Sequence, residues 1–205
     1  MAERKIALFG GTFDPIHLGH TTVAAEALES IGAEKLIFMP AKRSPLKGSD
    51  PKAGAHHRFR MIALAIAGHE KFELSNYELN RPEPSYTLDT VRHFKAAYNN
   101  QTQVYWLLGA DSIDDLPYWH RVTELIDECN LSTMYRAGRP VPDFSKFETI
   151  WGRKRVEKLQ RHVIRTSLID ISSTQIRERL TRGDDVSGML HPAVADYIRR
   201  NRLYS

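Results

Sequence analysis

The feature that most constrains the fold of this chain is the alternation of short apolar runs with segments of helical periodicity. The first apolar run, "KIALFG" at residues 5–10, precedes a segment whose apolar residues recur at helical spacing over residues 18–31. Further strands are predicted at residues 35–39, 71–75, 104–109, 131–135 and 163–168, and further helices at 57–68, 86–98, 119–129, 173–182 and 192–202. Strands that alternate with helices pair in parallel, so the sequence predicts an α/β fold with a doubly wound parallel sheet.

Four unusual loops follow the first four predicted strands. They are "GGTFDPIHLGH" at residues 10–20, "SPLK" at 44–47, "NRPEPSYT" at 80–87 and "GADSIDD" at 109–115. In a parallel sheet all four loops lie at the same edge, and doubly wound sheets bind their ligands at the carboxyl ends of the strands. We therefore expect one binding site built from these loops.

Charge and composition narrow the class of ligand. The chain has a net charge of +4, and residues 151–182 hold nine Lys or Arg against three acidic residues. Such a segment attracts nucleic acid or the phosphates of a small substrate, although a solvated basic helix is the simpler interpretation for most of these residues. The single cysteine, Cys129, excludes an internal disulfide and favours a reducing compartment. The absence of a long apolar run predicts a cytoplasmic protein that does not cross a membrane.

The first loop carries the residues of an anion site. His17 and His20 are three residues apart at the predicted start of a helix, where free N–H groups and the helix dipole favour negative charge. Gly19 leaves their face open, and Gly10 and Gly11 permit close approach of a ligand. A metal-binding pair is the alternative, with Asp14 as the nearest further ligand in the sequence. Phosphate binding is the preferred hypothesis.

A second candidate anion site lies in "ISSTQIRERL", residues 171–180. Ser172 and Gln175 match a capping box, which by itself predicts a helix N-terminus. The capping box does not account for three consecutive hydroxyl side chains followed by Arg177 in the most basic part of the chain. Hydroxyl groups and a guanidinium at a helix start are typical of a phosphate site.

These motifs together resemble a known family. "GGTFDPIHLGH" and "ISSTQIR" resemble the H-x-G-H and I-S-S-T-x-I-R signatures of the nucleotidyltransferase superfamily. Between and after them, "RFRMIALAI", "SYTLDTV", "GADSIDDLPYWH", "YRAGRP" and "DYIRRNRLY" follow the order found in bacterial nicotinate-nucleotide adenylyltransferases. The resemblance implies a Rossmann-like nucleotidyltransferase fold in a single domain over residues 1–205. Its core would span residues 1–170, and a small C-terminal helical part would span residues 171–205.

The resemblance also implies an activity. Members of this family transfer AMP from ATP to nicotinate mononucleotide, giving nicotinate adenine dinucleotide (deamido-NAD) and pyrophosphate in NAD biosynthesis. Mg²⁺ would be held mainly by the substrate phosphates, and the protein would provide no metal site of its own. The partners would be these small molecules and not nucleic acid, with a monomer and a homo-oligomer both open. The alternatives are an adenylyltransferase acting on nicotinamide mononucleotide or phosphopantetheine, and a nucleic-acid-binding protein that uses residues 151–182.

The family's functional residues map onto positions of this chain. The resemblance implies that the catalytic residues are His17, His20, Lys47 and Arg177. It implies that ATP contacts Gly10, Gly11, Thr12, Phe13, Gly19, Ser172, Ser173 and Thr174. It implies that nicotinate mononucleotide contacts Ser85, Tyr86, Thr87, Gly109, Asp111, Trp119 and Arg136.

The pyridine site has a physical rationale, and one loop departs from the family pattern. Trp119 would stack on the pyridine ring, and the nicotinate carboxylate would bind the positive end of the helix that starts near Tyr86. Alternatively, Ser85 or Thr87 merely caps that helix. The family's "P-P-H-[KR]" loop reads "SPLK" here, so Leu46 replaces a histidine while Lys47 keeps the cation.

Overall fold

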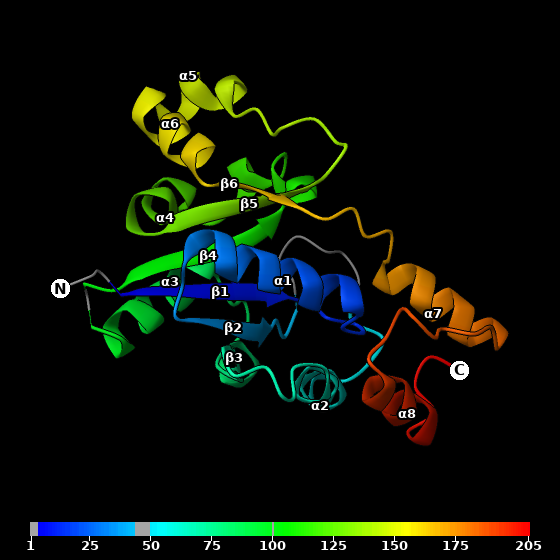
Figure 1. Cartoon of the computed structure of the whole chain (residues 1–205). Coiled ribbons are helices and arrows are strands. Elements are labelled where there is room, and N and C mark those ends of the chain that lie inside the picture. Colours follow the sequence, from blue (N-terminus) through cyan, green and yellow to red (C-terminus); the bar gives the residue numbers. More distant parts are fainter. Residues whose placement is uncertain (1–3, 44–49, 100) are drawn as a thin grey trace.

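The predicted parallel sheet is present. A computed structural model describes residues 4–43, 50–99 and 101–205, and it contains a six-stranded sheet in the order β3-β2-β1-β4-β5-β6, with every neighbouring pair parallel (Figure 1). The strands are β1 (Lys5–Gly11), β2 (Lys35–Pro40), β3 (Phe72–Leu74), β4 (Gln103–Gly109), β5 (Asn130–Arg136) and β6 (Val163–Thr166). The chain order reverses between β1 and β4, which is where a doubly wound sheet opens a crevice for a ligand.

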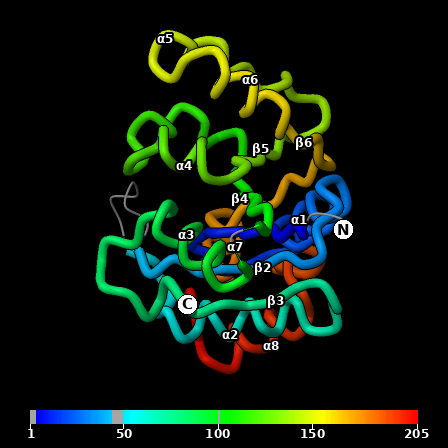
Figure 2. The backbone as a smooth tube through the Cα atoms, turned by 90° about the vertical axis from the view of Figure 1, so that its left-hand side faces the viewer, coloured from blue at the N-terminus to red at the C-terminus, as the bar shows by residue number. Residues whose placement is uncertain are grey.

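Helices cover both faces of the sheet (Figures 1 and 2). Their bounds are α1 (Leu18–Ile31), α2 (Ala55–Ala65), α3 (Thr87–Ala97), α4 (Val122–Glu128), α5 (Glu148–Trp151), α6 (Arg153–Arg161), α7 (Ser173–Arg182) and α8 (Pro192–Arg200). Helices α1, α2, α7 and α8 share one hydrophobic cluster, and α3, α4, α5 and α6 share the other. No helix within the described part of the chain is long and apolar enough to span a bilayer.

Strand β1 separates the two clusters. Successive side chains of a strand point to opposite faces, and the buried Ala7 and Phe9 belong to the α1 face whereas Ile6 and Leu8 belong to the α3 face. A strand that is apolar on both sides is typical of a covered parallel sheet. This burial fixes the position of the loop that follows β1, on which the first motif lies.

The structure differs from the sequence prediction around Trp119. A helix was predicted over residues 119–129, but α4 begins at Val122 and a separate 3₁₀ helix covers Leu116–Tyr118. Trp119 is extended between them, and Arg121 has a left-handed backbone with φ of 52°. Trp119 is therefore part of the connection after β4, at the ligand-binding edge of the sheet.

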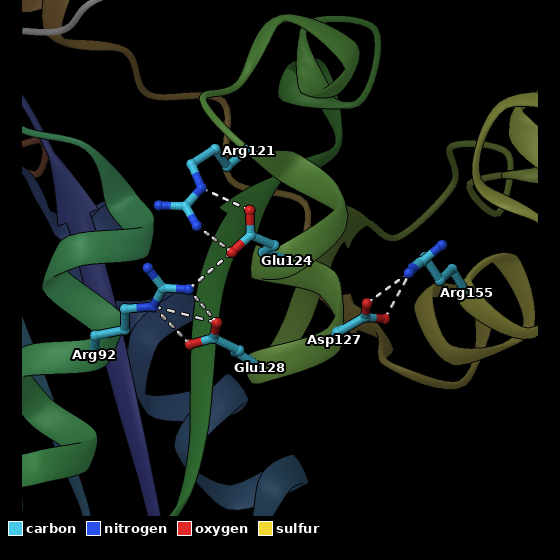
Figure 3. Close-up of polar contacts among 6 residues, drawn as sticks. All are labelled: Arg92, Arg121, Glu124, Asp127, Glu128 and Arg155. Carbon is cyan, nitrogen blue, oxygen red and sulfur yellow. Dashed lines mark hydrogen bonds and ion pairs between the residues drawn. The ribbon is translucent and has the colours of Figure 1, made fainter.

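Some of the basic side chains after residue 150 are engaged in local ion pairs. Arg155 on α6 forms two hydrogen bonds of 2.8 and 2.6 Å with the Asp127 carboxylate on α4 (Figure 3). Arg92 on α3 pairs with Glu124 and Glu128 from the other side of the same helix. Exposed pairs of this kind contribute little to stability, but the Arg155 pair directs a positive charge of α6 onto α4. This agrees with the simpler interpretation of a solvated basic helix.

Candidate active site

Two adjoining cavities lie at the carboxyl edge of the sheet. The larger has a volume of about 970 Å³ and the smaller about 400 Å³. Both are lined by Phe9, Gly10, Gly11, Thr12, Gly109 and Ser112. The ends of β1 and β4 therefore form a common wall, and the two cavities can hold two parts of one extended ligand or two substrates side by side.

His17 and His20 stack against each other on the wall of the larger cavity. Their ring centroids are 3.6 Å apart with an angle of 23° between the planes. The two residues form a reciprocal capping box at the start of α1, in which each Nδ1 accepts the backbone N–H of the other residue at 3.3 Å. His17 is the N-cap and precedes the helix, whereas the sequence placed both histidines in its first turn. The capping box fixes both rings, and in the neutral form of His17 it leaves Nε2 as the protonated nitrogen.

His17 is kept uncharged. Burial, and secondarily the positive charge of Arg136, lower the pKa of His17 to about 4. A neutral imidazole whose Nδ1 accepts a hydrogen bond carries its proton on Nε2. His17 can therefore donate a hydrogen bond to a phosphate oxygen while it stays uncharged. Its position between a helix N-terminus and an arginine is suited to polyanions and unsuited to a cationic metal.

Glycines leave room for neighbouring side chains at the sheet edge and at the histidine pair. A Cβ atom on Gly10 would lie 2.5 Å from the Trp106 ring, and one on Gly19 would lie 3.0 Å from Nδ1 of His17. Neither position accepts a side chain without displacing its neighbour. At Gly109 a Cβ atom would meet Oδ1 of Asp111, so the Asp111 side chain would have to turn away.

A buried polar cluster centred on Asp14 holds the first loop. The Asp14 carboxylate accepts hydrogen bonds from the backbone N–H groups of Lys52 and Ala53 and from the hydroxyl of Tyr204. Beside it, Arg58 is 1% exposed, and its guanidinium donates to the carbonyl of Thr12 at 2.7 Å. These three donors connect the Asp14 carboxylate to residues 52–53 and to Tyr204, so that Asp14 holds the first loop in place.

The second motif lies directly against the first. Ser172 is the N-cap of α7, and its Oγ accepts the N–H of Gln175 at 3.1 Å, as the capping box predicts. Ser173 Oγ donates to the carbonyl of Pro15 at 2.9 Å, and Arg177 Nη1 donates to the carbonyl of Asp14 at 2.7 Å. Both side chains also line the larger cavity. They tie the two motifs, about 150 residues apart in the sequence, into one wall.

The smaller cavity contains an aromatic side chain and an uncapped helix start. Tyr86 is the N-cap of α3, and no described side chain makes a capping hydrogen bond there. The Ser85 hydroxyl points instead to the Glu78 carbonyl at 3.5 Å. Trp119 lines the same cavity, and its Nε1 is buried without a hydrogen-bond partner among the described residues. The N–H groups of the first turn of α3 thus remain available for an anionic group beside an aromatic ring.

The structure divides the predicted site residues between the two cavities. Those on the larger cavity are Gly10, Gly11, Thr12, Phe13, His17, Gly19, His20, Gly109, Asp111, Arg136, Ser172, Ser173, Thr174 and Arg177. Those on the smaller one are Gly10, Gly11, Thr12, Ser85, Tyr86, Thr87, Gly109 and Trp119. Asp111 and Arg136, both expected with the mononucleotide, line the larger cavity, where His17 lies, and not the smaller one. Lys47 and Leu46 lie outside the described residues.

Several residues of the site were not identified from the sequence. Glu78, Trp106 and His120 line the smaller cavity, and Asp14 and Tyr204 hold the first loop. The available sequence signal is that Asp14, His120 and Tyr204 fall within the motifs that carry the family resemblance. Nothing local in the sequence pairs Asp14 with Tyr204.

The donor set of the site does not resemble a metal centre. Within residues 4–43, 50–99 and 101–205, no three His, Cys, Asp or Glu side chains are grouped so that they could hold a metal ion. Imidazole, guanidinium, hydroxyl and backbone N–H groups bind phosphate oxygens. This chemistry fits a divalent cation that would enter already bound to the phosphates of a nucleotide.

Comparisons with known proteins agree with this geometry. The cytidylyltransferase-like family model matches residues 8–179. A probable nicotinate-nucleotide adenylyltransferase of Methylacidiphilum infernorum is 38% identical over 200 residues, covering 98% of this chain and 92% of the relative. One from Dehalococcoides mccartyi (strain ATCC BAA-2266) is 35% identical over 206 residues, covering 100% and 98%.

A solved structure shares the fold. Nicotinic acid mononucleotide adenylyltransferase of Plasmodium falciparum, complexed with NaAD, matches with a TM-score of 0.75 at 21% identity, covering 98% of this chain and 97% of that one. Together with the family model and the full-length relatives, the fold leaves one assignment. The chain belongs to the cytidylyltransferase-like family and, within it, to the nicotinate-nucleotide adenylyltransferases.

Proposed function

We propose that the protein transfers the AMP moiety of ATP to nicotinate mononucleotide and releases pyrophosphate. The observation that carries this proposal is the uncapped start of α3 beside Trp119, in a cavity that adjoins the stacked His17 and His20. The smaller cavity suits a pyridine ring with a carboxylate. The larger cavity suits a triphosphate.

The reaction needs neither an enzyme nucleophile nor a general base. An oxygen of the mononucleotide phosphate, already anionic at neutral pH, attacks the α-phosphorus of ATP. A new P–O bond forms as the bond from the α-phosphorus to the bridging oxygen breaks, and pyrophosphate leaves with that oxygen and its electron pair. The task of the protein is to align two polyanions and to stabilise charge on the transferred phosphoryl group.

The residues around the larger cavity fit that task. The neutral His17 and the adjacent His20 would donate hydrogen bonds to the phosphates of ATP, and the first turn of α7 would hold the leaving pyrophosphate. Ser173 donates its single hydroxyl proton to Pro15, so the backbone N–H groups of α7 and Arg177 are better suited than that hydroxyl to contact phosphate. Mg²⁺, bound to the phosphate oxygens, would supply further charge neutralisation.

The acid is the preferred substrate on electrostatic grounds. The first-turn N–H groups of α3 favour an anion, and the carboxylate of nicotinate is negative whereas the carboxamide of nicotinamide is neutral. The same observation disfavours phosphopantetheine, because its pantetheine arm carries neither an aromatic ring for Trp119 nor a carboxylate for α3. A nucleic-acid-binding role gains no support, because Arg153 and Arg155 of α6 are held in ion pairs with Glu157 and Asp127.

The test is a pyrophosphate-release assay with ATP and either the acid or the amide mononucleotide. We expect release with the acid, weaker release with the amide, and loss of release in His20→Ala. His69→Ala is the matched control, because His69 is exposed and packs on Phe72 away from both cavities. Absence of release with any pyridine mononucleotide would disprove the proposal.

A further inference from the structure

The smaller cavity has a buried carboxyl group in its wall. Glu78 is 5% exposed and lines this cavity with Ser85 and Trp119. Its Oε1 accepts a hydrogen bond of 2.8 Å from the Thr90 hydroxyl on α3. No Lys, Arg or His nitrogen among the described residues forms an ion pair with it. A carboxylate that is buried without an ion pair is costly when ionised.

The charged groups near Glu78 do not neutralise it. Arg81, three residues along the chain, attracts it, but Nη2 of Arg81 is bonded to Asp89 at 3.0 Å. Burial raises the pKa of Glu78 to about 7, against the opposing effects of the Thr90 hydrogen bond and Arg81. The other titratable side chains that line the cavity are Arg43, Tyr86, Tyr118 and His120. In the free protein, Glu78 therefore changes charge close to neutral pH.

The ligand proposed for this cavity, nicotinate mononucleotide, would bring a carboxylate of its own into the cavity beside that of Glu78. Two negative carboxylates in one poorly solvated site repel each other, so one of them takes up a proton. The carboxamide of nicotinamide mononucleotide has no charge and creates no such demand. The acid therefore requires a protonated Glu78, whereas the amide does not.

We propose that Glu78 is a specificity-determining residue that must be protonated when nicotinate mononucleotide is bound, so that the preference for acid over amide falls as the pH rises. This inference rests on the proposed function, because it assumes that the pyridine ring occupies the smaller cavity. Glu78 would act through the field in the cavity and through α3, without contacting the reacting phosphates.

The expected pH dependence follows from linkage. A bound carboxylate raises the pKa of Glu78 above its value in the free protein, so binding of the acid consumes a proton in the range between the two values. Affinity for the acid is then level below about pH 7 and weakens by up to about tenfold per pH unit above it. Affinity for the amide shows no such decline, and both nucleotides share the same phosphate titration, so the amide is the internal control.

The experiment is titration calorimetry of the full chain with each mononucleotide, from about pH 6 to about pH 9, in buffers of different ionisation enthalpy. We expect an uptake approaching one proton per site for the acid near pH 8, in excess of any uptake for the amide. In Glu78→Gln, the excess proton uptake of the acid over the amide should vanish, and acid affinity should no longer decline with pH, while both nucleotides still bind. No excess uptake in the wild type, or an excess retained in Glu78→Gln, would overturn the inference.

A second variant tests the inference without replacing Glu78. The Thr90 hydrogen bond lowers the pKa of Glu78, so Thr90→Val, which keeps the side-chain shape, should move the decline in acid affinity to higher pH. A shift to lower pH, or no shift, contradicts the inference. Failure of both nucleotides to bind, or absence of pyrophosphate release, would instead count against the proposed function. Binding and release without the pH difference would overturn only the role of Glu78.

Discussion

The hydroxyl of Tyr204 donates a hydrogen bond of 2.6 Å to Oδ1 of Asp14, which joins the end of the chain to the loop after β1. Burial and the adjacent carboxylate raise the pKa of Tyr204 above its ordinary value, so the hydroxyl stays protonated and remains a donor. The carbonyl of Asp14 accepts the guanidinium of Arg177 at 2.7 Å. Residue 14 thus connects α7 and the C-terminal residues to the histidine loop.

This connection predicts an effect of Tyr204→Phe on ATP binding. Loss of one buried hydrogen bond should cost about 1–2 kcal/mol of stability. The Tyr204→Phe substitution should also raise KM for ATP more than KM for the mononucleotide, because the loop after β1 and α7 border the larger cavity. Steady-state kinetics with each substrate varied in turn measures both effects.

Tyr197→Phe is the control for that experiment. Tyr197 on α8 shares a hydrogen bond of 2.9 Å with Nδ1 of His57, and neither residue lines either cavity. A comparable loss of stability with an unchanged KM for ATP is expected. If both variants alter KM for ATP equally, the effect of Tyr204 is one of general stability.

A second prediction concerns the charge of His17. Because its pKa is lowered to about 4, the His17 ring in the free protein should stay neutral, with the proton on Nε2, as the pH falls through 6.5. Two-dimensional ¹H–¹⁵N spectra of the imidazole groups distinguish this tautomer. A His17 ring that becomes protonated near pH 6.5 would contradict the prediction.

The same lowered pKa has a consequence for stability. Below pH 6.5 the unfolded chain protonates this histidine while the folded protein does not, so unfolding is favoured as the pH falls from about 6.5 to about 4. The contribution of His17 is fully present above pH 6.5 and amounts to at most about 3 kcal/mol. His17→Gln should show a smaller loss of unfolding free energy over this range in denaturant titrations.

The sequence allowed the fold to be predicted because the relevant signals are local. Period and composition identified the strand predicted at residues 5–10, which the structure extends to Gly11, and the helix ending before Gly32, which has a left-handed backbone with φ of 66°. The histidine spacing and the Ser172 cap are likewise contained in a few residues. The Asp14–Tyr204 bond spans 190 residues, and nothing within either segment indicates the other. Trp119 was assigned to a helix because the extended conformation of that residue depends on its tertiary position.

A third prediction addresses the pyridine site. Trp119→Ala should raise KM for nicotinate mononucleotide about tenfold or more and KM for ATP much less, because base–aromatic stacking contributes about 1–3 kcal/mol. Trp119→Phe should recover much of the loss through stacking. Equal changes in KM for both substrates in the alanine variant would remove Trp119 from the pyridine site.

The fourth prediction concerns Arg58, whose guanidinium is buried and donates to the carbonyls of Thr12, Ala41, Lys42 and Ala53. Arg58→Met fills a similar space but leaves these carbonyl groups without their donor. Buried unsatisfied groups are costly, and hydrogen bonds from a charged donor contribute about 1.5–3 kcal/mol.

We therefore expect the free energy of unfolding of Arg58→Met to fall by about 3–5 kcal/mol, measured by urea titration. Arg60→Met on the same helix is the matched control, because Arg60 is exposed, and it should change stability by less than about 0.5 kcal/mol. Where the Arg58 variant stays folded, its KM for ATP should also rise, since Thr12 lines both cavities. Equal stability of the two variants would mean that water replaces the guanidinium at no net cost and that Arg58 does not hold the loop.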